Sequence, residues 1–380
     1  MLNDISWEYI PAWLSISYLL SVWYLFAYGT IYIVKYNANW KENNRKVISF
    51  LCFFIVFAIF YCVDTDYLNY KFIVETASKW VSNVGSSTEI LYQRLAYWCN
   101  GNYELFRLIV WGAAIIIFSV CARRFGTSVY LALLMLFLLY YNYFCYARAS
   151  LAMSVFFLGV CILVTSRKRW WKIAGIAVMV FSLAFHRSML IPLSISPLMF
   201  IDITKKNYFQ YFILIFVLLF LAINSIGDIV TLLDNEQYTY KLIHYESEIS
   251  EGRYYNSKNW KGFIRAYLGY FSFYIGFIIV SVPMLSKKYS QSIAVPIKKL
   301  YRITFGIIII SLCSYLAYGL NNVFFYRILF TSQIPISIMI AYMLYEGIPI
   351  KRGLYILLAV AFLNHSMALI HTVLERSFGI

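Results

Sequence analysis

The chain carries little charge for its length and lacks the short motifs of the common soluble enzymes. Only 13% of its 380 residues are charged, whereas about 25% is usual for a soluble domain. It has no Walker A lysine motif, no HExxH, no GxSxG and no glycine-rich dinucleotide fingerprint. These absences argue against a soluble globular protein, and against the nucleotide, zinc-protease, serine-hydrolase and dinucleotide chemistry that such motifs support.

Metal and secretion signatures are also absent. The seven cysteines show no CxxC and no Cys/His ligand spacing, so neither a metal nor another cofactor is expected. Only Cys62 and Cys99 are placed to pair outside the membrane. The N-terminus has no basic n-region and no small-residue cleavage site, so the first helix is expected to be an uncleaved anchor. Buried free thiols are expected at Cys52, Cys121, Cys145, Cys161 and Cys313.

Hydrophobic residues are what the chain has in abundance. They make up 62% of it, and the mean hydropathy is +0.70, which predicts an all-α polytopic membrane protein forming one integral domain over residues 1–380. The net charge of +15 comes from Lys and Arg clusters between apolar runs. That distribution is typical of cytoplasmic membrane loops and excludes nucleic acid as a partner.

The apolar runs predict about twelve transmembrane helices of about 16 to 23 residues each. With the N-terminus outside, most of the 32 basic residues fall in inward loops, as the positive-inside rule expects. The predicted spans lie near residues 13–34, 47–62, 104–122, 128–146, 149–166, 172–186, 188–204, 208–226, 263–285, 301–320, 327–346 and 353–371.

Two outward segments are too long to be simple turns. Residues 63–103 mix aromatic and apolar side chains with Asp, Lys and Ser, which suits short amphipathic helices at the membrane interface. Residues 227–262 are polar and rich in Tyr, as expected of a lid or a carbohydrate-facing loop.

The stretch from Tyr146 to Ile191 joins two membrane-length segments through the basic turn SRKRWWK. At about 1.5 Å per helical residue, Arg148 lies roughly 30 Å from Lys168, and His186 lies roughly 20 Å from Lys172. Both side chains are therefore expected near the same, outer interface. Because ionisable groups at membrane depth are costly, they usually serve a partner or a substrate.

Further cations are predicted on the same side, at Arg187, Arg265 and Arg327. Arginine grips phosphate oxygens with a planar fork of donors, so these residues and Arg148 indicate an anionic lipid head group or a lipid-linked diphosphate. The alternative is that Arg148, Arg187 and Arg327 reach ordinary phospholipid phosphates along the interface.

Two carboxylates and His186 are the candidates for proton transfer. His186 could donate to a phosphate, act as a general base, or only bond a neighbouring helix. Asp66, in the Asp64-Thr65-Asp66 pair, could take a proton from a sugar hydroxyl, or it could cap a helix. Glu89 follows Ser and Thr and has the same two interpretations.

These residues give the chain a resemblance to the EpsG/Wzy-type family of bacterial polysaccharide polymerases. The resemblance depends on YARASLAM, SRKRWWK, AFHRSMLIPL with its Phe-His-x-Ser pattern, DTDYLNY and NNVFFYRILF. The position after Arg148, often Gln in that family, is Ala149 here. The resemblance implies a GT-C-like glycosyltransferase of the bacterial inner membrane, with its active site facing the periplasm or outside. Its implied substrates are undecaprenyl-pyrophosphate-linked oligosaccharides, used to build O-antigen, capsule or exopolysaccharide.

The resemblance and the cation cluster leave three functions to compare. A polymerase is favoured, with a chain-length regulator and a flippase as further partners implied by the resemblance. A flippase or exporter of lipid-linked oligosaccharide would show repeats and charges near the bilayer midplane, and neither is evident. An O-antigen ligase would use the same donor and differ only in its acceptor.

Overall fold

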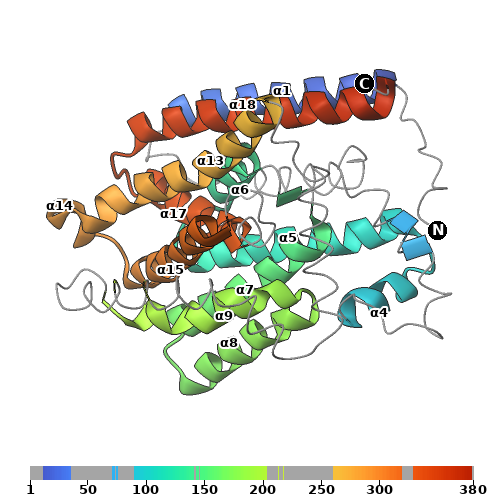
Figure 1. The fold of residues 1–380 in the computed structure, drawn as a ribbon. Helices are drawn as coiled ribbons and strands as arrows, with labels where there is room; N and C mark the ends of the chain where they lie inside the picture. Colours follow the sequence, from blue (N-terminus) through green and yellow to red (C-terminus); the bar gives the residue numbers. More distant parts are fainter. Residues whose placement is uncertain are drawn as a thin grey trace. The chain divides into compact units, whose positions relative to one another are not determined.

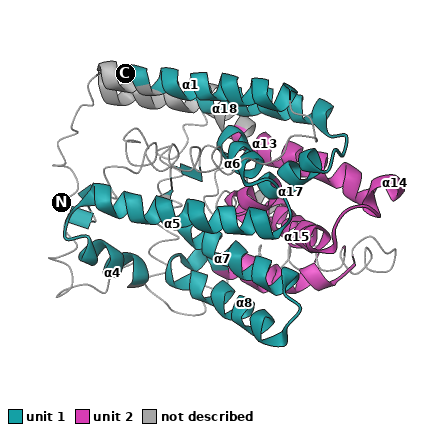
Figure 2. Ribbon diagram, turned by 180° about the vertical axis from the view of Figure 1, so that it is seen from behind, with its two compact units in different colours: residues 1–189, 337–380 teal, residues 190–336 magenta. Residues whose placement is uncertain are grey.

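The computed structural model describes residues 12–35, 71, 72, 74, 75, 90–140, 143, 144, 146–202, 213, 217, 260–318 and 328–378. The described residues are helical or lie in turns and short links between helices, with no strand among them, which confirms the predicted all-α class. They divide into two compact units, residues 1–189 with 337–380, and residues 190–336, coloured separately in Figure 2.

Unit 1 is a set of helices from both ends of the chain. In Figure 1, α1 and α18 run side by side, and α5, α7 and α8 form a second layer. Its helices are α1 (Ala12–Lys35), α4 (Ile90–Trp98), α5 (Tyr103–Arg124), α6 (Val129–Leu139), α7 (Ala147–Thr165), α8 (Arg169–Phe181), the short η2 (Ser182–Ala184) and η3 (Arg187–Met189), most of α17 (Gln333–Tyr345), and α18 (Lys351–Phe378).

Aromatic contacts join the first and last helices. The ring of Phe362 on α18 lies 5.1 Å from that of Phe26 on α1, and Trp23 Nε1 donates to Ser366 Oγ at 3.0 Å. Gly29 faces Leu134 and Leu138 on α6, and a Cβ there would come within 2.8 Å of Leu134. A small residue at this position therefore lets α1 approach α6 closely.

The ends of α5 are determined locally by its sequence. The Asn102 side chain accepts a hydrogen bond from the Leu105 amide at 2.8 Å, which satisfies one of the four amides that a helix leaves unbonded at its start. Glu104 stands in the first turn, and Arg123 and Arg124 stand in the last, the arrangement that the helix dipole favours. The chain then turns at Gly126, whose φ is +77°.

Two glycines allow α7 and α8 to pack very closely. A Cβ on Gly159 would lie 2.5 Å from Met179 Cγ and 2.6 Å from the Gly175 carbonyl oxygen, and one on Gly175 would lie 2.8 Å from the Gly159 carbonyl oxygen. No real side chain fits such gaps, so the two helices cross backbone to backbone at this point.

Two predicted spans are wrong in their extent. The span predicted at 128–146 is an 11-residue helix that ends at Leu139, too short for a hydrocarbon core of about 30 Å. Beyond it, the Tyr143 amide donates to the Tyr140 carbonyl at 2.8 Å, and both side chains are buried. The span predicted at 188–204 is divided into η3, α9 (Leu190–Ile195) and η4 (Ser196–Phe200), with Pro197 at the start of η4, because proline cannot supply a helical N–H.

Unit 2 contains α9, η4, α13 (Trp260–Leu285), α14 (Lys287–Ser290) and α15 (Val295–Tyr318). In it, α15 packs on η4 and α9. Arg302 Nη2 lies 3.2 Å from Asp202 Oδ1, and Arg302 Nη1 donates to the Met199 carbonyl at 3.4 Å. Gly306 meets Leu198, where a Cβ would come within 2.7 Å. A cation and a glycine of α15 thus fix the segment that follows α9.

Several predictions fall mainly outside the described residues. These include the spans near 47–62 and 208–226 and almost all of the segment 227–262. Within 63–103, α4 forms a short helix. The cysteine prediction is confirmed where it can be compared: Cys121, Cys161 and Cys313 are buried free thiols, and so is Cys99, which the sequence allowed to pair with Cys62.

Candidate functional site

Arg148 lies at the second residue of α7 and is half-buried. The carbon at the centre of its guanidinium lies 5.6 Å from the centre of the Tyr92 ring on α4. Tyr92 is only 2% exposed. A cation over an aromatic face is attracted to the ring. This contact therefore helps to orient the Arg148 guanidinium.

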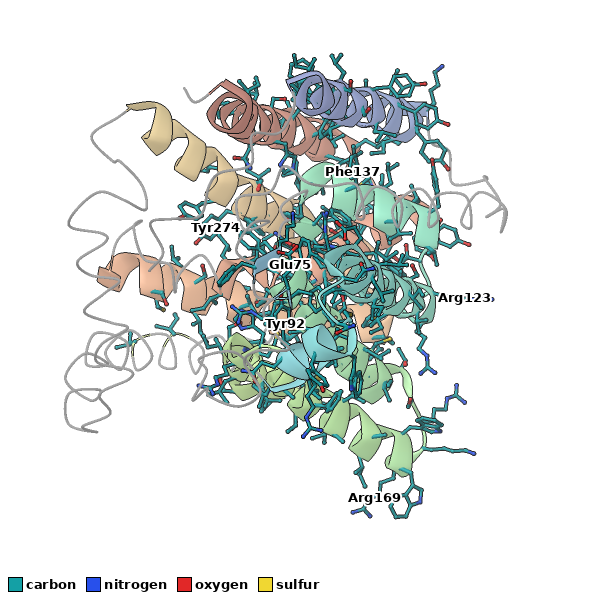
Figure 3. All side chains as sticks on the ribbon, turned by 90° about the vertical axis from the view of Figure 1, so that its right-hand side faces the viewer. Glu75, Tyr92, Arg123, Phe137, Arg169 and Tyr274 are labelled. Atoms are coloured by element: carbon teal, nitrogen blue, oxygen red, sulfur yellow. The ribbon has the colours of Figure 1, made fainter. Side chains whose placement is uncertain are left out.

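Tyr92 belongs to an aromatic cluster between α4 and α5. Its ring meets Phe106 edge to face at 5.0 Å, and Phe106 stacks on Tyr103 at 6.3 Å. All three side chains are at most 2% exposed. Figure 3 labels Tyr92 on α4, and Arg169 at the start of α8. The cluster is thus a rigid support for Arg148.

A second arginine at this cluster was missed by the sequence analysis. Arg107 on α5 is 2% exposed, and its guanidinium lies 5.7 Å from the Tyr103 ring centre. Its signal in the sequence is an ionisable residue one turn inside the predicted span 104–122, which is costly without a specific partner. The aromatic cluster therefore has an arginine at each end, Arg148 on α7 and Arg107 on α5.

The turn before α7 fixes the position of Arg148. The Tyr143 hydroxyl lies 2.6 Å from Ser154 Oγ and donates to the Ser150 carbonyl at 3.3 Å, while Ser150 Oγ donates to the Tyr143 carbonyl. Tyr143 also packs on Trp111 of α5, with ring centres 6.0 Å apart. These buried bonds join the turn to the first two turns of α7, where Arg148 stands.

His186 follows η2 and is half-buried. Its Nδ1 accepts a hydrogen bond from the Ser188 amide at 3.2 Å and lies 3.0 Å from Ser188 Oγ. The backbone is held as well, since the His186 amide donates to the Ser182 carbonyl at 3.2 Å and the Met189 amide donates to the His186 carbonyl at 3.1 Å. The ring is therefore part of a closed, hydrogen-bonded turn.

Arg148 and His186 lie at the same end of the α7–α8 pair, as the sequence predicts. Each stands eleven residues from the glycine crossing. Arg148 precedes Gly159 by about 16 Å of helix, and His186 follows Gly175 just beyond the end of α8 and η2. In agreement with this, α7 packs against η2 and η3 on either side of His186, and α4 also packs against η2.

The other predicted site residues are placed as follows. Arg187 is exposed in η3. Arg265 lies on α13 in unit 2. The remaining predicted residues, Asp66, Glu89 and Arg327, lie outside the described residues. In the described part of the chain, no group of His, Cys, Asp and Glu could hold a metal ion.

These features define a helical membrane protein with a supported arginine and a histidine at one end of a helical pair. Three helices among the described residues are long and apolar enough to cross a membrane, at Tyr103–Arg124, Arg148–Thr165 and Ile328–Tyr345. The EpsG family model matches residues 45–378, so the chain belongs to the EpsG family. No curated protein and no solved structure matches the chain. Membership of this family suggests a polysaccharide polymerase-type, glycosyltransferase-like function.

Proposed function

We propose that the protein polymerises lipid-linked oligosaccharides at the outer face of the bacterial inner membrane. It transfers a growing glycan from undecaprenyl pyrophosphate onto a second lipid-linked repeat unit. The observation that carries this proposal is the contact of Arg148 with Tyr92, in which the guanidinium carbon lies 5.6 Å from the ring centre. Arg148 stands at the N-terminal end of α7, and the turn that holds His186 lies at the same end. The EpsG family match supports the same class of reaction.

The proposed glycosyl transfer makes few chemical demands on the site. The acceptor hydroxyl oxygen forms a bond to the anomeric carbon, the bond from that carbon to the phosphate oxygen breaks with its electron pair, and the hydroxyl proton passes to a base. Pyrophosphate is a good leaving group, so the protein must stabilise its charge and orient the acceptor. This needs fixed cations more than a strong nucleophile.

Arg148 is suited to the leaving group because its fork can bond two phosphate oxygens at once. We assign Arg148, His186 and Arg327 to the donor pyrophosphate, with Arg265 and Arg187 as further contacts to phosphate or acceptor. Arg107 extends this cationic group on α5.

A carboxylate is assigned to the acceptor, Asp66 or Glu89. Either could take the proton of the attacking hydroxyl, and the Tyr-rich segment 227–262 is proposed to guide the glycan. The proposed partners are the lipid-linked substrate, membrane lipids, a flippase that supplies the repeat unit and a chain-length regulator. No nucleotide sugar takes part.

The experiment is a reconstitution. The purified protein in nanodiscs is incubated with its undecaprenyl-pyrophosphate repeat unit, without nucleotide sugar, and the glycans are resolved by gel. A ladder of lengthening products is expected. Unextended substrate, together with its translocation in liposomes, would contradict the proposal in favour of a flippase. Transfer of single glycans only to a different added acceptor would contradict it in favour of a ligase.

A further inference from the structure

Ser188 presents two polar atoms to the same ring nitrogen of His186. Its backbone nitrogen lies 3.2 Å from Nδ1, and its Oγ lies 3.0 Å from Nδ1. A backbone N–H can donate a hydrogen bond but cannot accept one. Nδ1 must therefore be the acceptor in this contact, which means that it carries no proton.

Hydrogen bonds in the surrounding turn restrict the position of the His186 ring. The His186 amide is bonded to the Ser182 carbonyl and its carbonyl accepts from the Met189 amide. Ser182 and Met189 are themselves buried, and Ser182 Oγ donates to the Met179 carbonyl at 2.6 Å. Because Met179 forms the α8 side of the glycine crossing, the turn is joined to the rigid part of the α7–α8 pair.

The protonation of the second ring nitrogen follows from the first. A neutral imidazole carries one proton, and the hydrogen bond made by one nitrogen decides which nitrogen has it. With Nδ1 as an acceptor, Nε2 carries the proton. An Nε2–H group donates hydrogen bonds to anionic oxygen, whereas it cannot remove a proton from a sugar hydroxyl.

We propose that Ser188 is a positioning residue that holds His186 as an Nε2–H donor for the phosphate oxygens of the lipid-linked substrate. His186 is then not the general base, and the acceptor proton goes to a carboxylate. This inference rests on the proposed function for the identity of the anion. The proposal also gives a physical reason for the Phe-His-x-Ser spacing, because a residue two positions beyond the histidine can reach back to Nδ1 within one turn. The intervening Arg187 is exposed.

The first test measures the proton positions without substrate. The protein contains four histidines, so it is labelled with ¹⁵N-histidine and the His186 signals are identified as those missing from His186→Gln. At a pH above the usual histidine pKa of about 6.5, we expect Nδ1 to give the signal of an unprotonated nitrogen and Nε2 the signal of a protonated nitrogen. A proton on Nδ1, or an exchanging mixture of both forms, would overturn the proposal whatever the protein's activity.

The second test separates a donor from a base. Glutamine can place an amide N–H near the position of Nε2 but cannot accept a proton from a hydroxyl. If His186 donates, His186→Ala should lose about 10- to 100-fold in polymerisation rate, and His186→Gln should recover most of that loss. If both variants fall equally, by the roughly 100- to 10,000-fold expected for a lost general base, the donor role is wrong.

Ser188 itself is tested with a conservative pair. Ser188→Ala keeps the backbone donor and removes the hydroxyl, so we expect a loss of about 2- to 10-fold and a His186 spectrum that shows some protonation of Nδ1. Ser188→Thr restores the hydroxyl and should restore both readouts. A Ser188→Ala protein with an unchanged spectrum and rate would contradict the positioning role. If the spectra are as expected but wild-type protein forms no polymer, the failure belongs to the proposed function instead.

Discussion

Arg148 and Tyr92 are joined by a cation–π contact, with the guanidinium carbon 5.6 Å from the centre of a ring that is almost completely buried. The two residues come from different helices, α7 and α4, so the contact also determines where the start of α7 meets the segment before α5. An aromatic face attracts a cation, so the ring orients the guanidinium. An oriented guanidinium is what a bidentate bond to pyrophosphate needs.

Replacing Tyr92 should therefore affect both stability and activity. Tyr92→Ala removes a buried ring, and large-to-small changes of this kind cost about 3 to 5 kcal/mol. It also releases Arg148 from a contact worth about 0.5 to 2 kcal/mol. We expect a lower melting temperature and a much reduced polymerisation rate, measured on the same preparation. Tyr92→Phe keeps the ring and should retain most of both properties, and equal losses in the two variants would contradict the role given to the ring.

The glycine crossing of α7 and α8 predicts a strong effect of Gly159→Ala. The new Cβ would meet Met179 Cγ at 2.5 Å and the Gly175 carbonyl at 2.6 Å, and overpacking of this kind costs about 1 to 3 kcal/mol. Gly112→Ala on α5 is the matched control, because nothing lies within 4 Å of its Cβ position. Thermal unfolding should show a loss for Gly159→Ala and no loss for Gly112→Ala. Similar melting temperatures for both would show that the helices are not this close.

Tyr143→Phe should destabilise the turn before α7. It removes the hydroxyl that lies 2.6 Å from Ser154 Oγ, and a buried polar group left without its partner costs about 1 to 3 kcal/mol. Tyr97→Phe, at a side chain that is 50% exposed, serves as the control and should be neutral. The comparison is made by thermal unfolding together with the polymerisation rate, which should fall because the turn positions Arg148. An unchanged rate at reduced stability would mean that the turn does not position this arginine.

Cys99 should react slowly with thiol reagents. It is a buried free thiol, and burial raises the pKa of the Cys99 thiol. Because only the thiolate reacts, its labelling should rise at a higher pH than that of an unfolded cysteine. A variant keeping only Cys99 is labelled with a maleimide across pH, with denatured protein as the reference. Rapid labelling at neutral pH would contradict the burial, and a Cys62–Cys99 crosslinked peptide from wild-type protein would contradict the free thiol.

Hydropathy and end signals predicted α5 and α7 well, because such long apolar runs need no tertiary information. The span at 128–146 was wrong because Tyr143 packs on Trp111 and bonds to Ser150 and Ser154 instead of continuing the helix. The contact with Trp111 joins residues far apart in the chain, so no local pattern shows it. The break at 188–204 is different, since Pro192 and Pro197 were visible in the sequence.

The shared end of Arg148 and His186 was predictable from their distances to the basic turn. The residues that support the site could not be predicted from the sequence. Tyr92 resembles other aromatic residues of an interfacial segment, and only the packing of α4 against α5 and the contact with Arg148 give its ring a role. Arg107 was overlooked because its apolar neighbours make the whole segment look like an ordinary transmembrane helix. The contact from Ser188 to Nδ1 depends on the geometry of a turn and has no signature beyond its spacing.

The most direct test of the account is the polymerisation rate of Arg148→Ala in the reconstituted assay. Losing an arginine bonded to a buried phosphate costs about 2 to 5 kcal/mol, so the rate should fall by about 30-fold or more, with Arg148→Lys intermediate because lysine has no fork. Arg169→Ala, at an exposed arginine on the far side of the glycine crossing, should behave as wild type. A well-folded Arg148→Ala protein that makes polymer at the wild-type rate and length would contradict the assignment of this site.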